Sequence, residues 1–118
     1  LLLAGACRPL YMPPLIESSQ PEERPRLQLE LVLEGGRPQL EVGVLSVARE
    51  GWLAVQWFTP FGREVASDSV WLDRDSIGLR HALPLPADVP LQPGEWRVLL
   101  SQHSQVIRQL TVLVRAGG

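Results

Sequence analysis

From Arg26 onward, apolar and polar residues alternate along the chain, the pattern of strands with one buried face. Glycine and proline clusters interrupt this alternation at short intervals, as turns between strands do. No segment has a convincing helical period of 3.6 residues. Strands are therefore expected at about residues 26–34, 39–48, 52–58, 64–72, 77–83, 95–100 and 110–114.

Successive side chains of a strand point to opposite faces of the sheet, so the odd or even position of a residue (its parity) predicts which residues form the core. In the third segment Leu53, Val55 and Trp57 share one face, while Trp52 and Phe58 fall on the other. Apolar groups on both faces are typical of a central strand. The same parity argument, applied to the last hairpin, points Trp96 inward together with Trp57.

The second segment contains an irregularity. Gly43 and the doublet Val44-Leu45 break the alternation and predict a β-bulge, in which one extra residue shifts the facing of those that follow. After such a bulge, Leu45 and Val47 are expected to face the core.

Two short motifs resemble known families of β-sandwich domains. The run Pro93-Gly94-Glu95-Trp96-Arg97-Val98, followed by a turn and an apolar strand, resembles the last hairpin of immunoglobulin-like sandwiches such as fibronectin III modules. The turn Thr59-Pro60-Phe61-Gly62 after an aromatic strand is similar to that of macroglobulin-type domains. The expected fold is all-β, a single immunoglobulin-like antiparallel β-sandwich of about seven strands over residues 26–118. A small open β-barrel is the alternative, and neither fold by itself implies a function.

The segment before these strands resembles a bacterial lipoprotein. Leu1-Leu2-Leu3-Ala4-Gly5-Ala6-Cys7 is similar to a lipobox, the end of a signal peptide in which small residues precede a lipidated cysteine. This resemblance makes residues 1–7 the end of the signal peptide and Cys7 the lipidation site. Proline-rich residues 8–25 then form a tether. The alternative is a buried cysteine in an N-terminal strand, which the Arg8-Pro9 exit fits less well.

A lipidated Cys7 implies a place in the cell. The protein is expected in the bacterial cell envelope, bound to membrane lipid through Cys7 and facing away from the cytoplasm. Arg8, rather than aspartate, follows the cysteine, which in this family indicates the outer membrane if the cell has two. The apolar run itself is far shorter than the about 20 residues that span a bilayer.

Composition excludes several classes of function. The net charge of −2 offers no basic surface for nucleic acid, and all basic residues are arginines, so a catalytic lysine is absent. A single cysteine permits no internal disulfide. No cofactor is expected.

Candidate catalytic and metal-binding residues form no convincing pattern. His81 and His103 are available as bases, but no serine lies in a nucleophile elbow, so an envelope hydrolase is a minor alternative and no enzyme is expected. Asp68, Asp73 and Asp75 are close in sequence, yet they lack the spacing of a calcium loop. A solvated loop is expected there, and no metal site.

The aromatic residues are more informative. The chain has four tryptophans, more than one small sandwich core usually holds. Trp52, Phe58, Phe61 and Trp71, with Arg63 nearby, are expected at the surface as a partner-binding cluster, because aromatic residues and arginine dominate interface hot spots. Alternatively, these side chains cover the second sheet face or lie under the N-terminal arm.

Together these observations predict a membrane-anchored envelope lipoprotein. It is expected to act as a non-enzymatic protein-binding or scaffolding module with an envelope protein partner of unknown identity. The alternative function is a carrier of a small apolar ligand in the cell envelope.

Overall fold

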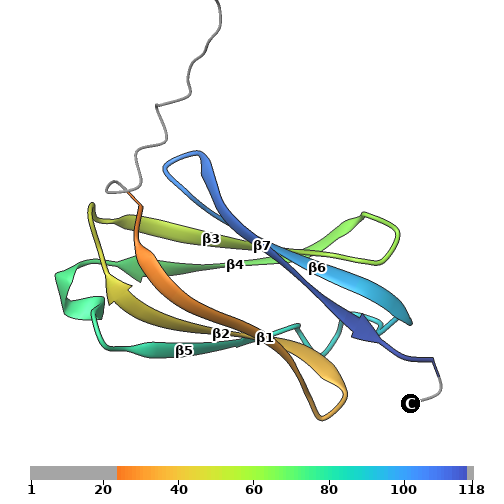
Figure 1. The fold of residues 1–118 in the computed structure, drawn as a ribbon. Coiled ribbons are helices and arrows are strands. Elements are labelled where there is room, and N and C mark those ends of the chain that lie inside the picture. The colour runs from red at the N-terminus through yellow and green to blue at the C-terminus, as the bar shows by residue number, and fades with distance from the viewer. Residues whose placement is uncertain (1–23, 117–118) are drawn as a thin grey trace, which may run out of the picture.

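The computed structural model describes residues 24–116, which form two antiparallel sheets packed face to face (Figure 1). One sheet has three strands in the order β1-β2-β5, and the other has four in the order β4-β3-β6-β7. The strands are β1 (Arg26–Glu34), β2 (Arg37–Ser46), β3 (Gly51–Phe58), β4 (Glu64–Leu72), β5 (Arg80–Pro84), β6 (Gly94–Gln102) and β7 (Gln105–Val114), and η4 (Arg74–Ser76) is a single 3₁₀ turn. The predicted seven-stranded β-sandwich is confirmed, and the sheets do not close into the alternative barrel.

The core lies between the two sheets and consists of the side chains that parity places inward. Trp57 and Trp96 are both buried there, and β3 is a central strand between β4 and β6, as predicted. Aliphatic side chains from both sheets surround the two indoles, among them Leu40, Val42, Leu53, Val55, Leu72, Val98 and Leu100. The space between the sheets is therefore filled by side chains.

Two tight hairpins illustrate how local sequence sets the strand pairing. Gly35 and Gly36 both have positive φ and join β1 to β2, the backbone that a two-residue hairpin turn requires. His103 and Ser104 take the same left-handed conformation between β6 and β7, although neither is glycine. The turn between β6 and β7 therefore holds two non-glycine residues in a backbone region that such residues seldom adopt.

The bulge in β2 is present, but one of its predicted consequences is wrong. Arg26 pairs with Ser46 and Leu27 with Val44, so Leu45 is the extra residue without a partner on β1. Its side chain is 53% exposed and does not face the core, whereas Val47 packs against the core as expected. An unpaired bulge residue is free to turn its side chain to solvent.

The fifth strand is shorter than predicted. It begins at Arg80, because the preceding residues form a turn in which Gly78 has positive φ. In that turn the amide of Gly78 donates to the carbonyl of Val44, and the amide of Val44 donates to the carbonyl of Leu79. Ile77 and Leu79 are consequently exposed beside the end of β2.

The sandwich has two ends, and the described chain begins at one of them. Residues 24–26, 45–52, 71–80 and 102–108 form the entry end, where the described chain begins at Arg24 (Figure 1). Residues 33–38, 58–64, 84–95 and 113–116 form the far end. Residues 1–7 and the tether up to residue 23, including Cys7, lie outside the described residues, so what was predicted for them stays a prediction. Among the described residues no helix is long and apolar enough to cross a membrane.

Candidate functional site

The predicted aromatic cluster occurs as two groups at opposite ends of β3. Trp52 and Trp71 are register partners on β3 and β4, and both are exposed, at 60% and 43%. Their ring centroids lie 5.2 Å apart in an edge-to-face arrangement. Phe58 and Phe61 lie six or more residues further along, which is about 20 Å in an extended strand. We call Trp52 and Trp71 the tryptophan pair.

The tryptophan pair is held in a fixed orientation by the turn that follows β4. The indole N–H of Trp71 donates to the Asp73 carboxylate at 3.1 Å. The backbone amide of Asp73 donates to the hydroxyl of Ser76 at 3.0 Å, and this hydroxyl lies 3.3 Å from the carbonyl oxygen of Trp71. Ser76 is itself buried, so η4 is tied closely to the end of β4. Asp73 therefore braces an aromatic side chain.

The second group is centred on the turn between β3 and β4. Phe61 stands at its tip and is 83% exposed, the highest exposure among the large hydrophobic residues of the described chain. The buried hydroxyl of Thr59 accepts hydrogen bonds from the amides of Phe61 and Arg63, at 3.2 and 3.3 Å. Backbone bonds from Thr59 to Arg63 and from Gly62 to Thr59 close the same turn at 2.9 Å. The turn thus presents Phe61 and Arg63 on a rigid frame.

Phe58 is only partly exposed, because the outer face of β6 covers it. The guanidinium carbon of Arg97 lies 5.1 Å from the centre of the Phe58 ring, within range of a cation–π interaction. Sequence analysis missed Arg97. Its position in the strand could have identified it. Arg97 follows Trp96 directly and must therefore point to the opposite, outer face, where it lies next to Phe58 of β3.

Two surface hollows flank Phe61. One of about 290 Å³ is lined by Thr59, Pro60, Phe61, Gly62, Glu95 and Arg97. The other, of about 420 Å³, is lined by Thr59, Phe61, Arg63, Val65, Pro90 and Gln92. The structure therefore brings Phe61 and Arg63 together beside concave surface, and it keeps Trp52 and Trp71 away from them.

A larger hollow lies at the far end, below the proline-rich connection between β5 and β6. Its volume is about 530 Å³, and most of its lining is apolar. The lining residues are Leu33, Gly35, Gly36, Leu91, Pro93, Leu113, Val114, Arg115 and Ala116. It opens where the β1–β2 turn, the connection and the end of β7 meet.

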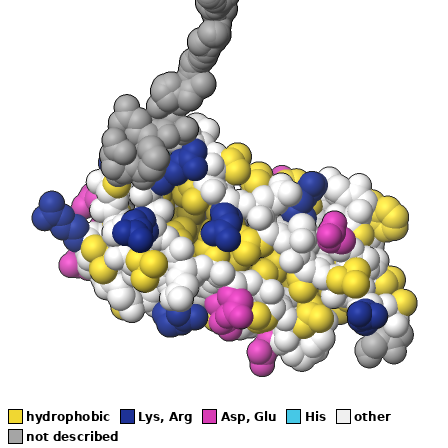
Figure 2. All heavy atoms as spheres, viewed as in Figure 1, with side chains coloured by type: hydrophobic (Ala, Val, Ile, Leu, Met, Phe, Trp, Pro, Cys, Tyr) yellow, Lys and Arg dark blue, Asp and Glu magenta, His cyan; other side chains and the backbone are white. Residues whose placement is uncertain are grey.

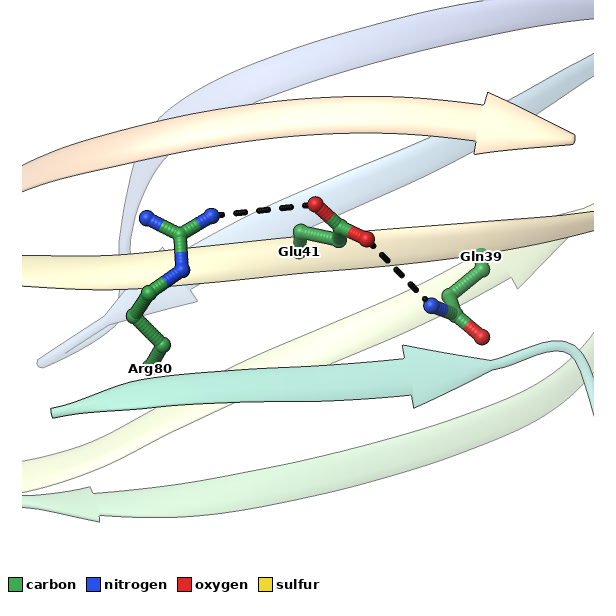
Figure 3. A network of polar contacts seen from close by, with 3 residues as sticks. All are labelled: Gln39, Glu41 and Arg80. Carbon is green, nitrogen blue, oxygen red and sulfur yellow. Dashed lines mark hydrogen bonds and ion pairs between the residues drawn. The ribbon is translucent and has the colours of Figure 1, made fainter. Parts of the chain in front are cut away.

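A small polar network covers the outer face of the three-stranded sheet (Figure 3). Glu41 lies 3.7 Å from the guanidinium of Arg80 and accepts a hydrogen bond from Gln39 at 3.4 Å. The Arg80 guanidinium also lies over Gly43, where a Cβ atom would approach within 3.2 Å of it. Such exposed pairs add little stability, and we assign this network to the solvated face of the sheet.

The residues considered for catalysis and metal binding lie apart. His81 is on β5, and His103 is at the tip of the β6–β7 hairpin beside Gly51. The side-chain hydrogen bonds found in residues 24–116 join neither histidine to a serine or a carboxylate. In the same part of the chain, no three histidine, cysteine or acidic side chains come together in a way that could hold a metal ion. Asp73, one of the three aspartates weighed for calcium, instead accepts the Trp71 indole N–H.

Comparison with known proteins gives no match: no family model, no curated protein and no solved structure is significantly similar to the chain.

Proposed function

We propose that the protein is a lipid-anchored lipoprotein of the bacterial cell envelope whose sandwich acts as a non-enzymatic protein-binding or scaffolding module. Cys7, in its lipobox-like sequence, supports the location, which is extracytoplasmic and at the outer membrane if the cell has two. The Phe61 turn supports the binding role. Its partner would be another envelope protein.

The observation that carries this proposal is the exposure of Phe61 on a braced turn at the end remote from chain entry. Aromatic residues, phenylalanine among them, are enriched at protein–protein interfaces relative to the rest of the surface. A turn that is already rigid loses little conformational entropy when it binds, so more of the contact energy appears as affinity. Arg63 beside it and hollows on both sides add features typical of interface hot spots.

Site-specific photocrosslinking in intact envelopes tests the proposal. A photoreactive phenylalanine at position 61 should form one dominant adduct with an envelope protein, which mass spectrometry identifies. The matched control carries the same group at Gln109, which is exposed on β7. With the identified partner purified, Phe61→Ala should weaken binding by about 2 kcal/mol, or roughly 30-fold. Identical adducts from both positions, or unchanged affinity of the variant, would contradict the proposal.

A carrier of a small apolar ligand is the second candidate, and the far-end hollow is the observation that favours it. Its volume of about 530 Å³ is in the range of small-molecule sites. Because side chains fill the space between the sheets, a ligand would bind in a surface hollow such as this one. A fluorescent fatty-acid analogue should then bind saturably, and Leu113→Asp should abolish that binding. Non-saturable binding that the variant leaves intact would reject the carrier.

A further inference from the structure

Exposed hydrophobic side chains are concentrated at the entry end of the sandwich. Of the nine exposed large hydrophobic residues in the described chain, six lie there. These are Leu45, Trp52, Trp71, Ile77, Leu79 and Val106. The apolar surface of this domain is therefore gathered at the end where residues 1–23 join it.

These side chains lie at several places around the end of the sandwich. Trp52 contacts Trp71 across the β3–β4 pair, and Trp71 is bonded through Asp73 to η4. The residues after η4 then cross to the other sheet, where Gly78 and Leu79 bond to the backbone of Val44 in β2. Ile77 and Leu79 are exposed in this crossing segment, and Leu45 is exposed beside a hollow lined by residues of β1 and β7.

Charge is also divided between the two ends. The entry end carries six arginines, at positions 24, 26, 49, 74, 80 and 108, against three carboxylates, Glu50, Asp73 and Asp75. The rest of residues 24–116 carries four arginines against seven carboxylates. When Glu41 is counted with Arg80, its ion-pair partner, the entry end is positive by two charges and the rest of residues 24–116 is negative by two. Figure 2 shows arginine side chains around the point of chain entry, with hydrophobic side chains between them.

We propose that the entry end docks on the surface of an anionic phospholipid bilayer. Tryptophan is the side chain best suited to the headgroup level, because its ring is apolar and its N–H is polar. Arginines attract anionic lipid and can bond two phosphate oxygens at once. Exposed hydrophobic side chains among arginines bind an anionic membrane surface more favourably than they interact with water.

The proposal rests on the proposed function in one respect, since it needs the protein to face a membrane. The 17 residue steps from Cys7 to Arg24 can span at most about 60 Å when fully extended. A domain held within that distance can reach the bilayer with the end at which it is tethered. The Phe61 turn at the opposite end would then face away from the lipid, toward a partner.

Vesicle binding of the full-length chain carrying Cys7→Ser tests the proposal without any lipid anchor. Cosedimentation is measured with vesicles of mixed phosphatidylglycerol and phosphatidylcholine, and with phosphatidylcholine alone. Binding should require the anionic lipid and should fall when ionic strength rises from about 0.05 to about 0.5 M, where charges are screened. Binding to neither vesicle type, or equally to both at all salt concentrations, would overturn the proposal.

Variants in the same background locate the surface. Arg49→Gln/Arg74→Gln and, separately, Trp52→Ala/Trp71→Ala should each lower the partition coefficient about tenfold or more. The matched far-end control, Leu113→Ala/Arg115→Gln, should change it less than about twofold, since it lies outside the docking surface. Circular dichroism confirms that every variant is folded. Equal losses from the entry-end and far-end variants would contradict the assignment. Full binding by the entry-end variants would also contradict it, because the N-terminal segment would then carry the binding.

Fluorescence gives a second, independent readout. Brominated phosphatidylcholine in the vesicles should quench the emission of Trp52 and Trp71, while Trp57 and Trp96 are shielded in the core. Quenching should therefore disappear in Trp52→Phe/Trp71→Phe, and its persistence would overturn the proposal. The proposal would equally fail if the entry-end variants converted a dimer to a monomer in sedimentation without vesicles, because the surface would then be an interface between copies. Failure of Cys7 acylation or of Phe61 crosslinking affects none of these measurements, so the two proposals are refuted separately.

Discussion

Replacement of Trp96 by alanine should remove much of the stability of the sandwich. Trp96 is 0% exposed and fills the space between the sheets, and its indole N–H donates to the carbonyl of Gln92 at 2.7 Å. Truncating a buried tryptophan costs about 3–5 kcal/mol through lost burial and the cavity that remains. A domain of this size is stable by about 5–15 kcal/mol in total. The melting temperature should accordingly fall by more than about 12 °C.

Urea denaturation followed by far-UV circular dichroism measures this loss on the full-length Cys7→Ser chain. Trp52→Ala is the matched control, because the same truncation at an exposed position loses little more than the contact with Trp71. Its expected cost is below about 1.5 kcal/mol. Trp96→Phe keeps most of the ring and removes the hydrogen bond to Gln92, which separates the two contributions. A loss below about 1 kcal/mol for Trp96→Ala would refute the placement of this residue in the core.

Two further substitutions test the backbone and the sheet edge. Gly94 has φ of +130°, and a Cβ atom there would lie 2.7 Å from Cβ of Pro60, so Gly94→Ala should cost more than about 1 kcal/mol in thermal unfolding; an unchanged melting temperature would argue against this close approach. Asp68 sits on the edge strand β4 opposite Val55, which places its side chain on the inner face, and an inward charge at an edge discourages pairing with another chain. Asp68→Val should therefore associate with increasing concentration in analytical ultracentrifugation, and a variant that stays monomeric would show that the charge has no such role.

Much of the sandwich could be predicted from residue periodicity, because a strand with one buried face must alternate. The inward positions of Trp57 and Trp96 followed from that alternation. The position of the bulge in β2 was predicted correctly, but the exposure of Leu45 was not. Periodicity identifies where a ladder is broken, whereas the direction of an unpaired side chain depends on the twist of the local backbone.

The sequence indicated which aromatic residues are exposed, but not how these residues are arranged relative to one another. Parity indicated that Trp52 and Trp71 lie on the outer face of their sheet, and both are exposed. Their separation from Phe61 follows from the length of β3, and the predicted single cluster did not take that length into account. The brace from Asp73 to Trp71 and the excess of arginine at the entry end depend on how loops from both sheets meet. Sequence order alone does not provide that information.

The most direct test of the proposed anchored module is the mass of its N-terminal peptide, measured on protein isolated from the membranes of the native cell. The account predicts that this peptide begins at Cys7 and carries the added mass of a diacylglyceryl group and, where the cell completes the modification, a further acyl chain. The Cys7→Ser variant should lack this mass and leave the membrane fraction. An unmodified Cys7 thiol still joined to Ala6 would contradict the account.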